Sequence, residues 1–249
     1  MSEPVDAVAL AERVKAGEVR AVSRLITLLE NHEPAGLEAM QRLERSTRRA
    51  EVIGITGYPG AGKSTLIDQL ATAYRRQGKK VGIVAVDTTS PLTGGAILGD
   101  RIRMQDHSLD AGVFIRSMAT RGHHGGLARS TREAVQVLEA AGYDVIFVET
   151  VGVGQDEVEV AGVAQTVVVV VAPGLGDEVQ AMKAGLLEVA HIVVVNKGDR
   201  DSADSTVRDL TEWVPKVVRT VAIKGEGLPE LIEAIAEHQR IADLRGKGV

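Results

Sequence analysis

The sequence contains no cysteine among its 249 residues. This absence excludes disulfides, thiolate zinc sites, iron–sulfur clusters and cysteine nucleophiles, and it is typical of a reducing compartment. The N-terminus carries Glu3 and Asp6 where a signal peptide would be basic, so we expect no export signal. These two features together predict a cytoplasmic protein.

Aromatic side chains, excess basic charge and long apolar runs are also scarce. Only 1 Trp, 3 Tyr and 2 Phe occur, so the core must be aliphatic. The formal net charge of −5 argues against nucleic acid or an anionic membrane as the main partner. The longest apolar run, residues 167–173, is far too short to span a bilayer. The 27 glycines, by contrast, indicate many tight turns or close backbone approaches.

The first part of the chain, residues 6–48, has the pattern of helices. Apolar residues from Val22 to Leu29 recur at the spacing of one helix face. The Pro-Ala-Gly sequence at 34–36 predicts a break before a second short helix over 37–43.

From Glu51 onward, short β-rich runs alternate with helical stretches. The expected strands are 52–56, 81–86, 113–115, 145–149, 167–172, 192–196 and 217–222. The expected helices are 64–77, 127–140, 179–188 and 228–238. Strands such as 167–171 are apolar at every position, which is typical of a parallel sheet covered on both faces.

This alternation predicts an α/β fold with a mostly parallel, doubly wound sheet and ligands at the carboxyl ends of its strands. We expect a helical N-terminal extension (1–49), a domain (50–240) that carries the P-loop and guanine motifs described next, and a short C-terminal tail (241–249).

The strongest motif is the sequence Gly-Tyr-Pro-Gly-Ala-Gly-Lys-Ser at 57–64, which matches G-x-x-x-x-G-K-[ST] between a strand and a helix. Its backbone N–H groups and the helix N-terminus would bind phosphates. Lys63 would contact the β- and γ-phosphates and take the catalytic role, and Ser64 would bind Mg²⁺. The expected nucleotide contacts are Gly57, Pro59, Gly60, Ala61, Gly62, Lys63, Ser64 and Thr65.

A second motif, Asn196-Lys197-Gly198-Asp199, follows an apolar strand and predicts guanine recognition. The Asp199 carboxylate can accept from both N1–H and N2–H₂ of guanine, whereas adenine offers an acceptor at N1. Lys197 would lay its stem over the base, and Asn196 would either fix the loop or reach N7. A backbone N–H at Ala222 or Ile223, after the next expected strand, would complete the base site.

Acidic residues at strand ends are candidates for Mg²⁺, which prefers oxygen ligands. They are Asp87 and Glu149, with Asp100 in a polar, Gly-rich stretch; a helix cap or an ion pair is the alternative role for each. Glu149 opens a sequence of the shape D-x-x-G with Glu in place of Asp, whose Gly152 would sense the γ-phosphate through its N–H. Gln155 would position the attacking water, although an ordinary loop glutamine would look the same.

Three segments, residues 94–104, 116–122 and 149–155, resemble the MeaB-type GTPases, the metallochaperones of methylmalonyl-CoA mutase that include the methylmalonic aciduria type A protein. The resemblance covers residues 7–240. It implies a GTPase that gates delivery of adenosylcobalamin to a B₁₂-dependent acyl-CoA mutase and protects that mutase.

The resemblance also implies site residues. The family's Mg²⁺ ligands correspond to Ser64, Asp87, Asp100 and Glu149. A mobile coupling loop corresponds to residues 173–185, with Asp177, Glu178, Gln180 and Lys183. Many members dimerise through a C-terminal arm, and this chain ends at Val249, so we expect weakened homodimerisation.

Two other functions compete with a mutase-directed GTPase. A nickel- or cobalt-inserting GTPase would usually carry cysteine or clustered histidine ligands, so the absence of cysteine argues against it. A P-loop kinase or transport ATPase would use ATP, which Asp199 disfavours. Comparing GTP with ATP binding separates the last function from the others.

Overall fold

The computed structural model describes residues 5–43, 49–87, 107, 109–119, 126–150, 162–174 and 185–246. Its strands are β1 (Glu51–Gly57), β2 (Val81–Asp87), β3 (Val113–Ala119), β4 (Val145–Thr150), β5 (Thr166–Val171), β6 (Ile192–Val195) and β7 (Val217–Arg219). Its α-helices are α1 (Ala7–Lys15), α2 (Val19–Glu30), α3 (Pro34–Leu43), α4 (Lys63–Arg76), α6 (Gly126–Ala140), α9 (Ala203–Thr211) and α10 (Leu228–Gly246). Two 3₁₀ turns, η2 (Leu186–Glu188) and η3 (Ala222–Lys224), complete the described elements.

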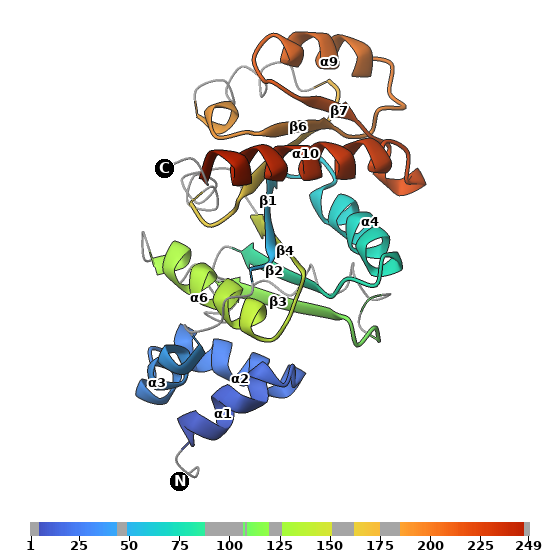
Figure 1. Ribbon diagram of the computed structural model, residues 1–249. Helices are drawn as coiled ribbons and strands as arrows, with labels where there is room; N and C mark the ends of the chain where they lie inside the picture. Colours follow the sequence, from blue (N-terminus) through green and yellow to red (C-terminus); the bar gives the residue numbers. More distant parts are fainter. Residues whose placement is uncertain are drawn as a thin grey trace, which may run out of the picture.

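The strands form one sheet in the order β3-β2-β4-β1-β5-β6-β7, and every described pair is parallel. The order reverses around β1, so the crossovers cover both faces of the sheet. Figure 1 shows this arrangement, with α4 and α10 on one side and α6 and α9 on the other. The predicted doubly wound P-loop fold is confirmed.

Alternate residues of each strand feed different hydrophobic clusters. Ile53 and Phe147 pack against α4 and α10, whereas Val52 and Val148 pack toward α6 and the N-terminal helices. The β5 strand, five of whose six residues are valine, is buried at every position, as expected for a strand with a layer on each side. The Phe147 ring also packs on the Tyr74 ring of α4, with centroids 6.0 Å apart.

The N-terminal residues form three helices, where the sequence predicted a break only at 34–36. Gly17, with φ +76°, ends the first helix before α2 begins. Pro34 begins α3, because proline at the first helical position loses no intrahelical hydrogen bond. The expected separation of two helices is confirmed, but the break lies at 31–33, because residues 34–36 form the first turn of α3.

Other element boundaries also differ from the sequence prediction. Strand β3 runs four residues beyond the expected 113–115, and β7 stops at Arg219 because the next residues turn into η3. Helix α9 was not predicted. Helix α10 continues to Gly246, across the expected tail boundary at 240/241. Within the described residues, no helix is both long and apolar enough to cross a membrane.

The N-terminal helices lie beside α6 and β3 (Figure 1). They are joined to the sheet by a charged contact as well as by apolar packing. Arg116 of β3 makes an ion pair with Glu30 of α2, and its guanidinium also donates to Thr27 Oγ1 at 3.1 Å. The two charged side chains are only 20% and 13% exposed. Substituting either Arg116 or Glu30 would leave the other charge poorly solvated. Such a change lowers the free energy of unfolding more than breaking an exposed ion pair does.

We predict that Arg116→Met lowers the free energy of unfolding by about 2 kcal/mol, because Glu30 loses a desolvated partner. Arg13→Met is the matched control, since the Arg13–Glu18 pair is about half exposed and is expected to contribute less than about 1 kcal/mol. Urea unfolding of both variants measures the difference. Equal losses in the two variants would contradict a stabilising role for the Arg116–Glu30 contact.

Candidate functional site

The phosphate-loop motif lies between β1 and α4, at the carboxyl edge of the sheet. Two of its glycines have positive φ angles, and at both positions a side chain would collide with a neighbouring residue. A Cβ on Gly57 (φ +128°) would lie 2.0 Å from the Val170 carbonyl oxygen, and a Cβ on Gly62 (φ +98°) would lie 2.3 Å from Asn196 Nδ2. Gly62 is the N-cap of α4, so the first turn of this helix faces the loop.

Lys63 begins α4 with its side chain turned back into the loop. It is 8% exposed, and its Nζ donates to the carbonyl oxygens of Gly57 at 2.6 Å and Tyr58 at 3.2 Å. The loop carbonyls therefore hold the ammonium group inside the curve of the loop. A cation in this position can neutralise charge on phosphate oxygens that bind to the loop N–H groups.

The Asn196 side chain joins the second motif to the phosphate loop. Its Nδ2 donates to the Ala61 carbonyl oxygen at 2.9 Å, and its Oδ1 accepts from Thr220 Oγ1 at 3.2 Å and from the Ala222 N–H at 3.0 Å. Asn196 is 3% exposed. Of the two roles considered for this residue, its contacts match fixing the loop. They also commit the Ala222 N–H to Asn196, so the expectation that this group faces the base is wrong.

Lys197 follows in a left-handed conformation, with φ +55°. This is uncommon for a residue with a Cβ, and here two contacts maintain it. Its Nζ donates to the Gly60 carbonyl oxygen at 2.7 Å, and the next N–H, of Gly198, donates to the Thr220 carbonyl oxygen at 2.9 Å. The lysine stem thus lies across the outside of the phosphate loop, with a surface on which a flat ring can stack.

Asp199 stands beyond this stem with its carboxylate at the surface. Its Oδ2 lies 3.2 Å from the Nζ of Lys224, a residue whose side chain the sequence analysis did not single out. The hydrogen bond from Lys224 is the main reason that the pKa of Asp199 lies below its usual value. The carboxylate is therefore held ionised, the state in which it can accept two hydrogen bonds.

Arg219 positions the turn that carries Asp199, and the sequence offered no signal for it. Its guanidinium donates to the Gly198 carbonyl oxygen and pairs with Asp204 at 2.5 Å. A Cβ at position 198 would lie 2.6 Å from Arg219 Cγ. The glycine inside the second motif is thus explained by the arginine that packs over it.

Two of the four predicted magnesium ligands meet at the carboxyl end of β4. Ser64 Oγ donates to Glu149 Oε1 at 2.8 Å, and Glu149 is 1% exposed. Both supply oxygen, the ligand type that Mg²⁺ prefers, at the expected side of the phosphate loop. Asp87 ends β2, the neighbour of β4, but its side chain lies outside the described residues, as does all of Asp100. No cluster of three metal-binding acidic or histidine side chains occurs in the part of the chain that the structure describes.

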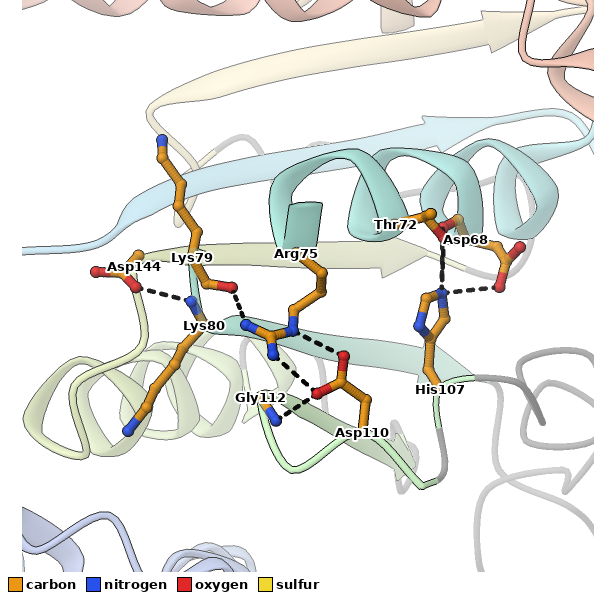
Figure 2. Close-up of polar contacts among 9 residues, drawn as sticks. All are labelled: Asp68, Thr72, Arg75, Lys79, Lys80, His107, Asp110, Gly112 and Asp144. Carbon is orange, nitrogen blue, oxygen red and sulfur yellow. Dashed lines mark hydrogen bonds and ion pairs between the residues drawn. The ribbon is translucent and has the colours of Figure 1, made fainter. Parts of the chain in front are cut away.

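The outer side of α4 is tied to the segment that leads into β3 (Figure 2). Arg75 makes two hydrogen bonds to the Asp110 carboxylate, at 2.8 and 2.9 Å, and this contact lowers the pKa of Asp110 to about 2. Two turns earlier in α4, Asp68 contacts His107, whose Nε2 lies 3.1 Å from Asp68 Oδ1 and 3.2 Å from the Asp68 carbonyl oxygen. The helix that carries Lys63 is therefore anchored on the side that faces the β3 edge of the sheet.

The remaining predicted site residues lie outside the described residues. They are Gly152, Gln155, Asp177, Glu178, Gln180 and Lys183. Pro59, Thr65 and Ile223 do lie in the described loop, helix and 3₁₀ turn, and Ile223 is 81% exposed next to the base motif.

Comparisons with known proteins agree with this geometry. The family model described as "Methylmalonyl Co-A mutase-associated GTPase MeaB" matches residues 22–248. A GTPase-family protein of Pyrococcus horikoshii is 53% identical over 98% of this chain and 81% of its own length. GTPase ArgK of Escherichia coli is 37% identical over 94% of this chain and 76% of its own length. The mitochondrial methylmalonic aciduria type A homolog of Mus musculus is 36% identical over 91% of this chain and 62% of its own length.

Two solved structures share the fold. The crystal structure of LAO/AO transport system kinase superposes with a TM-score of 0.75 and 30% identity, over 99% of this chain and 79% of that chain. HypB of Helicobacter pylori, solved in complex with nickel, shares the fold at 18% identity, with a TM-score of 0.58 over 82% of this chain and 93% of its own. With the family model matching most of its length and a P-loop joined to a guanine motif, this chain is a GTPase of the MeaB family.

Proposed function

We propose that this MeaB-family GTPase gates the delivery of adenosylcobalamin to a B₁₂-dependent acyl-CoA mutase, such as methylmalonyl-CoA mutase, and protects that mutase. The observation that carries the GTP half of the proposal is the contact of Asn196 with the phosphate loop, since it joins the proposed base motif to the proposed phosphate site. The mutase half is supported by the family description and by the mouse relative.

In this proposal the triphosphate lies against the loop N–H groups and the start of α4. Lys63 would exchange its carbonyl partners for the β- and γ-phosphate oxygens, where negative charge develops during hydrolysis. Ser64 and Glu149, with Asp87 and Asp100, would hold Mg²⁺, which neutralises phosphate charge when bound. Gln155 would orient the attacking water, and Gly152 would report the presence of the γ-phosphate.

The guanine ring would stack on the Lys197 stem and donate its N1–H and N2–H₂ groups to Asp199. A backbone group of Ile223 remains the proposed additional contact. Adenine would leave the charged carboxylate facing a ring acceptor, which costs more than a neutral mismatch. GTP is therefore the proposed substrate, and GDP and phosphate the products.

We predict that Asp199→Asn weakens GTP binding by roughly 10- to 100-fold, since it removes hydrogen bonds to a charged acceptor. The same variant should bind xanthosine triphosphate more tightly, because xanthine presents an acceptor where guanine presents the N2 donor. Asp201→Asn, at a nearby exposed aspartate, is the control. Titration with fluorescent nucleotides measures both affinities, and unchanged preference for GTP would show that Asp199 does not read the base.

Lys63→Ala is expected to lower the rate of GTP hydrolysis by about 100-fold or more, because a preorganised cation at the developing charge is lost. Lys216→Ala removes an exposed lysine and serves as the control. Single-turnover hydrolysis at saturating GTP measures the rate. A rate for Lys63→Ala within a few-fold of wild type would assign the charge stabilisation to another group.

Glu149→Gln keeps the volume of this buried side chain but removes its charge. We expect it to raise the Mg²⁺ concentration that gives half-maximal hydrolysis, because a neutral amide oxygen is a weaker ligand than a carboxylate. Circular dichroism confirms that the variant folds, and a Mg²⁺ titration of the hydrolysis rate gives the shift. A half-maximal Mg²⁺ concentration equal to that of the wild type would remove Glu149 from the proposed metal site.

The proposed link to the mutase is the loop over residues 173–185. Lys183→Ala should leave basal GTP hydrolysis and GTP affinity near the wild-type values. It should reduce the partner's acceleration of hydrolysis several-fold, in keeping with coupling energies of about 1–3 kcal/mol. Hydrolysis rates with and without saturating mutase, with Lys80→Ala as a surface control, measure this effect. Equal acceleration in Lys183→Ala and wild type would place the transmission elsewhere.

A further inference from the structure

A pocket of about 420 Å³ lies between α4, the end of η3 and the start of α10. The walls come from three separate parts of the chain. They are Gln69, Thr72, Ala73 and Arg76 of α4, Lys224 and Gly225 at the end of η3, and Leu228, Pro229 and Ile232 of α10. None of the roles proposed above uses this pocket.

The charges in its wall are of one sign. Arg76 and Lys224 line the pocket, and none of the nine lining residues is acidic. Arg76 is exposed and has no ion pair with any residue that the structure describes. The neighbouring carboxylate of Asp68 is already in contact with His107 (Figure 2) and accepts a hydrogen bond from Gln69. The pocket thus has positive charge available for an anionic group.

The opposite wall is apolar. Leu228 and Ile232 face the α4 cluster of the core, and Pro229 is exposed beside them. Ile223, the neighbour of Lys224, projects into solvent with 81% of its surface exposed. An aliphatic side chain this exposed, next to a basic pocket with an aliphatic wall, suits a ligand that combines a negative charge with apolar groups.

Lys224 connects this pocket to the base motif. Its Nζ lies 3.2 Å from Asp199 Oδ2, so one residue both lines the pocket and pairs with the carboxylate that would read guanine. A ligand carboxylate that binds Lys224 from the pocket side competes with the Asp199 carboxylate for the Lys224 ammonium group. Asp199 Oδ2 is then available to guanine, and by linkage guanine binding favours the pocket ligand to the same degree.

We propose that this pocket binds an acidic side chain, presented between aliphatic residues by a partner protein, and that its occupancy strengthens guanine-nucleotide binding by drawing Lys224 from Asp199. The positive charge of the pocket favours a carboxylate. Its apolar wall, formed by Leu228, Pro229 and Ile232, favours aliphatic residues on either side of that carboxylate in the partner. The linkage rests on the proposed reading of guanine by Asp199, whereas the pocket itself does not.

The test uses the full chain and the peptide acetyl-Leu-Glu-Leu-amide, with acetyl-Leu-Gln-Leu-amide as its uncharged counterpart. Backbone amide spectra of the nucleotide-free protein locate the peptide, and titration gives its affinity. We expect shifts at Ala73, Lys224 and Gly225, with the glutamine peptide binding about three- to tenfold more weakly. Arg76→Gln should produce a similar loss of affinity for the glutamate peptide, whereas Arg20→Gln, at an exposed arginine of α2, should not.

The linkage is measured as the affinity for GDP with and without saturating glutamate peptide. We expect the peptide to tighten GDP binding by about two- to fivefold, the range set by an exposed ion pair. Lys224→Gln should give the same gain without peptide and should abolish the peptide's effect.

The outcomes separate the two parts of the proposal. Equal affinity of the wild type for both peptides would show that the pocket does not bind an acidic side chain. Equal affinity of Arg76→Gln and Arg20→Gln for the glutamate peptide would show the same. Peptide binding that leaves GDP affinity unchanged in wild type overturns the linkage alone. If Asp199→Asn keeps full GTP preference while the glutamate peptide still binds, the proposed base reading fails and the pocket stands.

Discussion

The side-chain amide of Asn196 is the contact on which the nucleotide site depends. It reaches from the end of β6 to the Ala61 carbonyl of the phosphate loop and to two groups beyond β7, so it joins three strand ends. The amide is 3% exposed, and each buried partner left without it would lose a hydrogen bond that water cannot replace. The contact also explains Gly62, because a side chain there would occupy the space of the Asn196 amide.

The sheet turns this local contact into a binding edge. Since all described strand pairs are parallel, the carboxyl ends of β1, β4 and β6 lie along one side, and each contributes one part of the site. The phosphate loop follows β1, Glu149 lies at the end of β4, and the base motif follows β6. The valine-rich β5 between β1 and β6 brings its Val170 carbonyl so close to Gly57 that no side chain fits there.

Around this edge, paired charges hold the helices in place. The Arg75–Asp110 contact fixes the outer face of α4, and the Arg116–Glu30 contact fixes the N-terminal helices on β3. At the base motif, Arg219 holds Gly198 and Lys224 holds Asp199. Asp199, which would read the base, and Gly198 beside it are therefore held by cations from the following strand and turn. This arrangement makes guanine recognition sensitive to whatever contacts those cations.

The sequence alone determined the fold class and the principal motifs, because both are encoded over short spans. Alternating β-rich and helical runs, uniformly apolar strands and the spacing of G-x-x-x-x-G-K-S are local properties that tertiary context does not reverse. The expected β1 and α4 accordingly agree with the structure to within a residue at each end. Local sequence patterns predicted the secondary structure less well where polar residues dominate, and helix α9 was missed. Pro34 was interpreted as a break, although it begins α3.

The tertiary structure decided which side chains meet. Asn196 had two possible roles, and only the approach of β6 to the phosphate loop selected the contact with Ala61. The Ala222 N–H was expected at the base until the fold placed it on Asn196. The side-chain contacts of Arg219, Lys224 and Arg116 carried no sequence signal, since their partners lie 15 to 89 residues away along the chain. Such pairings depend on strand order and crossover geometry, which bring distant residues together and which no local periodicity encodes.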